Sequence, residues 1–227
     1  MTDSRLQELK RAWKASGSVE DEAAYLRERV RVGDLTQERL ELAAYCRHEA
    51  ALRVLCQHVM PPRPKPTPLE SEHDHGFSEW QKELRSFLRG LVHWGPKPLV
   101  LGGLLAVSTL LQGNYEGPGA TGLKLLRTWL ETPTTDATNQ VRRFLAEHAD
   151  TPDQGVLLTA LMLSHVVDAS CGSEDLPVEA VVRAVLRTSH SAPMSLGDSI
   201  LGNLERAISE LAVHDSLVSV DWPTKHS

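Results

Sequence analysis

The residues whose types and spacing could support nucleophilic chemistry lie in the stretch HVVDASC. His165, Asp168 and Cys171 follow one another at three-residue intervals. On a helix this spacing makes them neighbours, so that a carboxylate orients an imidazole beside a thiol. The same residues also suit a helix end, where His and Asp satisfy each other or the last carbonyls. Because no separate oxyanion loop or second base is visible, we favour the structural interpretation and predict no catalytic residues.

The residues best suited to bind a metal lie in the stretch EHDH, which contains Glu72, His73, Asp74 and His75. Adjacent residues in a flexible segment bind transition metals loosely, whereas a structural zinc site needs four fixed ligands. The chain also lacks the phosphate-binding, dinucleotide-binding, zinc-protease and serine-hydrolase motifs. We therefore predict no metal site and no cofactor.

The cysteines and the apolar segments indicate a cytoplasmic protein. The three cysteines, Cys46, Cys56 and Cys171, form no CxxC pair, and an odd number suits free thiols in a reducing compartment. The N-terminus is charged and amphipathic, unlike a signal peptide. The most apolar run, residues 99–111, has 13 residues and is too short to cross a bilayer.

The charge is distributed unevenly along the 227 residues. The whole chain has a net charge of −6, whereas residues 144–227 carry four basic and twelve acidic side chains, a net charge of −8. An acidic surface repels nucleic acid and attracts basic proteins, although the same charge also promotes solubility. Solubility is the preferred interpretation of this charge, and a basic protein partner is the alternative; we expect a protein partner, no nucleic acid and no membrane.

Four residues are the predicted contacts for this partner. Glu174, Asp175 and Glu179 cluster around Pro177, and Trp222 lies in a tail without helical pattern. The three carboxylates also have a structural interpretation, because they precede a predicted helix whose N-terminal dipole favours negative charge.

Helical periodicity recurs along the whole chain and predicts an all-α fold of about ten helices, stacked as antiparallel hairpins. Apolar residues repeat at helical spacing, and no convincing strand is present. Gly33 marks a helix end, so that residues 30–46 read as the turn between two paired helices. Capping patterns predict helix starts at Ser18, Asp34 or Thr36, Ser78 and Asp136.

A proline-rich segment divides the chain. Five prolines lie within residues 61–68, and proline excludes a helix there and favours an extended linker. The sequence therefore predicts a helical N-terminal module at residues 1–59, a linker at 60–76 and an all-helical main domain with a short C-terminal tail at 77–227.

Two stretches carry resemblances to known families. Residues 20–55 resemble an uncharacterised N-terminal module of myxobacteria and planctomycetes, in which His48 is matched and Arg47 stands where glycine is usual. The stretches LVHWGPKPLVLGGLLAV and GLKLLRTWLETP resemble an all-helical immunity family of bacterial polymorphic toxin systems through Trp94, Gly95, Trp129 and Leu130.

These resemblances imply stacked, HEAT-like helical hairpins, although the irregular spacing of this chain argues against a strict solenoid. They carry no catalytic residues over to this chain. We expect a non-catalytic protein that binds a protein partner, with a toxin-neutralising immunity protein as the narrower hypothesis. An enzyme that uses the His165, Asp168 and Cys171 group, or a scaffold or adaptor, is the alternative.

Overall fold

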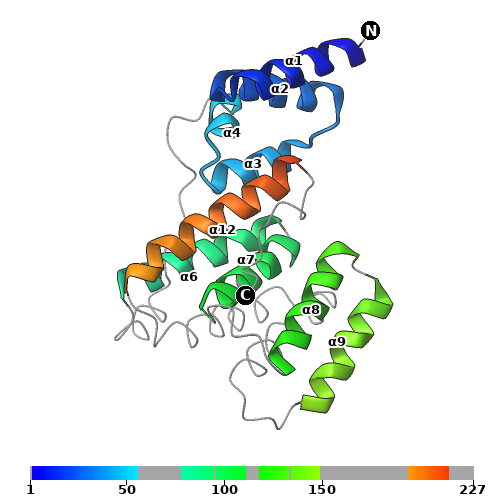
Figure 1. Cartoon of the computed structure of the whole chain (residues 1–227), viewed down its shortest axis with the longest axis vertical. Helices are drawn as coiled ribbons and strands as arrows, with labels where there is room; N and C mark the ends of the chain where they lie inside the picture. Colours follow the sequence, from blue (N-terminus) through cyan, green and yellow to red (C-terminus); the bar gives the residue numbers. More distant parts are fainter. Residues whose placement is uncertain are drawn as a thin grey trace. The chain divides into compact units, whose positions relative to one another are not determined.

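The computed structural model describes residues 2–55, 78–94, 96–110, 118–132, 134–148 and 194–214. Within these ranges the chain forms nine α-helices and one short 3-10 helix, with no strand (Figure 1). The predicted all-α fold is thus confirmed, with a helix count close to the expected ten. No helix in these ranges is long and apolar enough to cross a membrane.

The contacts divide the chain into two units that do not follow the sequence in order. The first unit contains Met1–Pro62 and Glu205–Val220, and the second contains Arg63–Leu204 and Asp221–Ser227. The sequence-based division, with a module at residues 1–59 and a main domain at 77–227, stays a prediction; among the described residues, 205–214 cluster with the N-terminal helices. The predicted linker, 60–76, lies outside the described residues and stays a prediction.

The first unit consists of α1 (Thr2–Ser16), α2 (Val19–Val32), α3 (Gln37–Tyr45), α4 (Glu49–Val54) and the C-terminal half of α12 (Met194–His214). Helices α1 and α2 lie side by side (Figure 1), α2 also packs on α4, and α4 packs on α3. The main partners of α2 are therefore α1 and α4. Of the two options for the helices beside residues 30–46, packing on each other or on another element, α2 takes the second.

Local capping explains where these helices begin and end. The Ser18 hydroxyl accepts a hydrogen bond from the Asp21 backbone N–H at 3.2 Å, as the capping pattern predicts. Gly33 ends α2 with a φ of 81°, in the left-handed region that favours glycine. Thr36 caps α3, whereas Asp34 forms an ion pair with Arg29.

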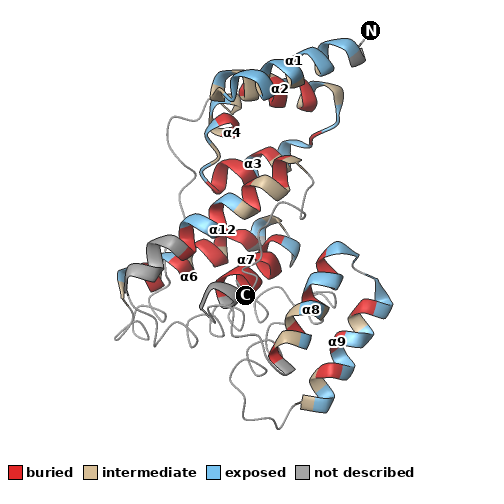
Figure 2. Ribbon diagram, viewed as in Figure 1, coloured by how far each residue is buried: buried red, intermediate tan, exposed pale blue. Residues whose placement is uncertain are grey.

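Figure 2 marks the buried residues of α2, α3 and α4. The core of the first unit combines large aliphatic side chains with alanines. Alanines at these positions let helices approach closely, because each adds only one methyl group to the interface. The buried apolar residues of this core include Leu26, Leu35, Leu40, Ala43, Ala44, Ala50 and Ala51.

The second unit contains α6 (Glu79–Leu91), η1 (Val92–Trp94), α7 (Pro96–Leu110), α8 (Pro118–Glu131), α9 (Thr135–His148) and the N-terminal half of α12. Consecutive helices pack on each other, from α6 to α7, α8 and α9. The Ser78 N–H donates to the Gln81 side chain at 2.8 Å, as its capping pattern predicts. The helix start predicted at Asp136 is wrong, because Thr134 caps α9 and Asp136 lies in its first turn.

Candidate metal centre

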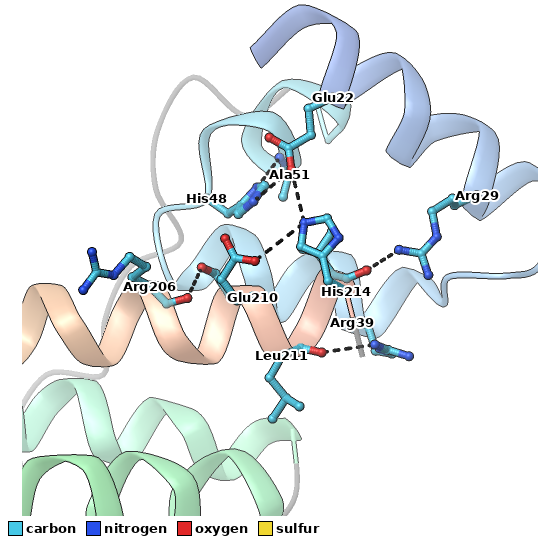
Figure 3. A network of polar contacts seen from close by, with 11 residues as sticks. Glu22, Arg29, Arg39, His48, Ala51, Arg206, Glu210, Leu211 and His214 are labelled. Atoms are coloured by element: carbon cyan, nitrogen blue, oxygen red, sulfur yellow. Dashed lines mark hydrogen bonds and ion pairs between the residues drawn. The ribbon is translucent and has the colours of Figure 1, made fainter. Parts of the chain in front are cut away.

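The predicted partner contacts, Glu174, Asp175, Glu179 and Trp222, lie outside the described part of the chain and stay predictions. The two groups to which the sequence analysis assigned no function also lie outside it: His165, Asp168 and Cys171, and Glu72, His73, Asp74 and His75. Of the three cysteines, Cys46 is described, and it is buried and forms no disulfide. Among the described residues a different cluster, Glu22, His48 and His214, brings two imidazoles to one carboxylate (Figure 3).

Three separate helices of the first unit supply this cluster. Glu22 lies in the first turn of α2, His48 is the N-cap residue of α4, and His214 is the last residue of α12. The cluster therefore joins the N-terminal helices to the C-terminal end of α12.

A strained turn places His48. Helix α3 ends at Cys46, and Arg47 then takes a φ of 61°, a conformation that is unfavourable for residues with a side chain. The N–H groups of Arg47 and His48 donate to the carbonyls of Ala44 and Ala43, each at 3.0 Å. The Arg47 side chain forms an ion pair with Glu205 at 3.1 Å. The turn reverses the chain so that His48 starts α4.

Two arginines hold the end of α12 that carries His214. Arg39 donates to the carbonyls of Ala212 at 2.8 Å and Leu211 at 3.2 Å. Arg29, which is buried, donates to the carbonyl of Val213. The last carbonyls of a helix have no partner within the helix and attract positive charge, so these contacts fix the backbone just before His214.

Aromatic stacking fixes the His214 ring. The indole of Trp13 stacks on the His214 imidazole with ring centroids 5.0 Å apart and planes 5° apart. Trp13 also stacks on Tyr25 at 5.5 Å. The His214 ring is thus oriented by α1 as well as by its own helix.

The polar atoms of the cluster converge on one oxygen. The Nε2 atoms of His48 and His214 each lie 3.5 Å from Oε1 of Glu22. One donor atom from each of the three residues lies within 4.8 Å of the other two. The side chains of His48, Glu22 and His214 are 11%, 16% and 20% exposed, so the cluster is shielded from solvent but still open to a small ion.

The hydrogen bonds of His48 define its protonation. Burial lowers the pKa of His48, while the carboxylates of Glu22 and Glu210 oppose this shift. The Nδ1 atom accepts a hydrogen bond from the Ala51 N–H at 3.3 Å. A neutral His48 therefore carries its proton on Nε2, directed toward Glu22.

Two imidazoles and one carboxylate form a donor set found in zinc sites. Zinc bonds of about 2.0–2.1 Å in tetrahedral geometry place two donors roughly 3.3 Å apart, close to the two 3.5 Å separations. Coordination through His48 Nε2 moves its proton to Nδ1 and breaks the cap to Ala51. Loss of a cap costs about 0.5–2 kcal/mol, and the binding of a metal has to offset this cost.

No local motif could have revealed this cluster. Metal motifs are recognised by short spacings on one element, whereas Glu22, His48 and His214 come from three helices distant in the sequence. In the sequence, His48 is only a histidine at a predicted turn, and His214 is only a histidine near the end of a predicted apolar helix. The chain matches no protein-family model, no curated protein and no solved structure.

Proposed function

We propose that this chain is a non-catalytic, all-helical protein that acts by binding another protein. The observation that supports this function best is the incomplete burial of α1. Leu6, Leu9 and Trp13 form one stripe at helical spacing, yet no residue from Ser4 to Ser16 is buried. Helix α2, on which α1 packs, buries Ala23 and Leu26 completely or nearly so.

A half-covered apolar stripe on a surface helix suits contact with a second protein. Amphipathic helices bind partners through apolar residues spaced by three or four positions, and aromatic residues such as Trp13 often dominate the binding energy of an interface. The remaining apolar surface of α1 would be buried in the complex, which is the main favourable contribution to association.

The narrower proposal is a toxin-neutralising immunity protein with a HEAT-like arrangement of hairpins. Its supports are the resemblance carried by Trp94, Gly95, Trp129 and Leu130 and the net charge of −8 in residues 144–227. The proposed partner is basic, with Glu174, Asp175, Glu179 and Trp222 as its predicted contacts. Charge complementarity of this kind speeds association and weakens with salt.

The test is binding of a co-purified partner by the full-length chain and by matched variants of α1. Leu6→Asp/Leu9→Asp places two charges on the apolar stripe, whereas Gln7→Asp/Ala12→Asp places two charges on exposed positions of the same helix. We expect the first variant to lose affinity by at least about tenfold, an effect of about 1.4 kcal/mol, and the second to bind as the wild type does.

If both α1 variants bind the partner with equal affinity, the apolar stripe of α1 no longer supports the proposed function. Thiol-dependent turnover by the isolated chain without any partner would instead favour the alternative enzyme that uses His165, Asp168 and Cys171. The thermal midpoint of each variant, measured in parallel, separates loss of binding from loss of folding.

A further inference from the structure

We propose that Glu22, His48 and His214 bind one transition-metal cation of the Zn²⁺ class, which fastens the end of α12 to the starts of α2 and α4 within the first unit. The two proposals are tested separately, because the α1 variants change Leu6 and Leu9, whereas the metal site uses α1 only through Trp13, which stacks on His214.

The convergence of the two imidazoles carries the proposal. Both Nε2 atoms approach the same carboxylate oxygen, Oε1 of Glu22, at 3.5 Å. Two independent His–Glu pairs would not need to share one oxygen, whereas three ligands of one cation must point toward a common centre. Both separations are close to the tetrahedral edge of about 3.3 Å that zinc bond lengths imply.

The ligands are held in place without any metal. Arg29 and Arg39 bind the carbonyls of residues 211–213, Trp13 stacks on the ring of His214, and the turn at Arg47 positions His48. These contacts reduce the ordering needed when the ion binds, whereas the hydrogen bond from the Ala51 N–H to His48 Nδ1 has to break.

The donor atoms select the class of cation. Imidazole nitrogen suits Zn²⁺, Cu²⁺ and Ni²⁺, whereas Ca²⁺ and Mg²⁺ prefer sites made of oxygen alone. With three protein ligands, zinc retains a fourth position for a water molecule or a further ligand. A further carboxylate lies beside the cluster, because Oε2 of Glu210 is 3.7 Å from His214 Nε2.

The experiment is a titration of the metal-free full-length chain with Zn²⁺ by calorimetry and with Co²⁺ by absorption. We expect one equivalent of Zn²⁺ to bind, Co²⁺ to give the intense visible absorption of a tetrahedral site, and Zn²⁺ to raise the thermal midpoint. The variants His214→Gln and His48→Asn should each weaken Zn²⁺ binding by on the order of a hundredfold. Asparagine at position 48 removes the imidazole but still caps α4.

A control variant tests whether the observed Zn²⁺ binding comes from the EHDH segment and not from Glu22, His48 and His214. His73→Gln/His75→Gln removes both imidazoles of that segment and should leave the Co²⁺ spectrum and the Zn²⁺ affinity unchanged. Circular dichroism establishes that each variant is folded, and Glu22→Gln supplies a third ligand substitution if one histidine variant unfolds.

Three results would overturn the proposal. They are the absence of stoichiometric Zn²⁺ binding by the wild-type chain, an unchanged Zn²⁺ affinity in folded ligand variants, and the loss of Zn²⁺ binding in His73→Gln/His75→Gln. A failure of the α1 variants to affect partner binding has no bearing on these measurements, so the two proposals fail separately.

Discussion

The two units of the chain are stabilised by different kinds of contact. In the first unit the described core includes the buried charged residues Glu28, Arg29 and Glu205, which bond to other side chains or to the end of α12. In the second unit Gln81 and Arg85 are also buried, but the core of α6 and α7 is dominated by leucines and Phe87.

This difference follows from how each unit is assembled. Helices α6 to α9 are consecutive and bury continuous apolar faces against their neighbours. The first unit combines the N-terminal helices with the C-terminal half of α12, and charged side chains make directional contacts with the end of α12. Apolar burial supplies most of the free energy, whereas hydrogen bonds to charged groups specify which helix end is bound.

The largest expected effect is the removal of an aromatic ring from the second unit. Phe87 is fully buried in α6, so Phe87→Ala should lower the free energy of unfolding by about 3–5 kcal/mol. Glu83→Ala, at an exposed position of the same helix, should change it by less than about 0.5 kcal/mol. Urea denaturation measures both values, and a small effect of Phe87→Ala would contradict an apolar core at α6.

The second prediction concerns a charged contact in the first unit. Arg29→Met removes the ion pair with Asp34, which is 2.6 Å long, and the hydrogen bond to the Val213 carbonyl. Hydrogen bonds to charged groups contribute about 1.5–3 kcal/mol each, and the half-exposed position of Asp34 reduces its share. We expect a loss of about 2–3 kcal/mol and faster amide exchange at the end of α12.

The matched control for this prediction is Asp34→Asn. This variant keeps the Val213 contact and should cost less than Arg29→Met, about 0–1 kcal/mol. Equal losses in the two variants would mean that the contact with α12 contributes nothing.

The third prediction separates strain from charge at Arg47. Arg47→Ala loses the ion pair with Glu205 and keeps the unfavourable φ of 61°, whereas Arg47→Gly loses the ion pair and relieves the strain. The glycine variant should therefore be more stable than the alanine variant by roughly 1 kcal/mol. A more stable alanine variant in thermal unfolding would show that position 47 is not left-handed.

The smallest expected effect is a pH dependence at Glu28. Hydrogen bonds from Arg31, at 2.6 and 2.8 Å, are the main reason why the pKa of Glu28 lies below its ordinary value. The folded state therefore binds this proton more weakly than the unfolded state, and its stabilising contribution is present above the ordinary glutamate range and lost as the pH falls through the lowered pKa.

Thermal unfolding of the wild type and Glu28→Gln over a range of pH tests this sign. The variant should have the lower midpoint at neutral pH, and the difference should shrink in acid. A difference that grows in acid would contradict the direction of the pKa shift.

The sequence predicted the helices better than the contacts between them. The caps at Ser18 and Ser78 and the stop at Gly33 are local signals, because each depends on residues within one turn. The buried stripe of α6 is equally local, since its apolar residues repeat at helical spacing.

The candidate metal centre could not be predicted in the same way. His48 and His214 become neighbours only after residues 205–214 pack with the N-terminal helices, and no periodicity encodes that pairing. Arg47 shows a related limit, because a left-handed conformation is expected for glycine and is adopted here by a residue with a long side chain.

The most direct test of this account is a double-mutant cycle between Glu22 and His214, measured by urea denaturation of the metal-free chain. If the end of α12 lies against α2, Glu22→Gln and His214→Gln should be coupled by at least about 0.5 kcal/mol. The control pair Glu22→Gln and His148→Gln, whose residues belong to different units, should be additive. Additivity of the Glu22 and His214 substitutions within about 0.3 kcal/mol would contradict the packing of the end of α12 against the N-terminal helices.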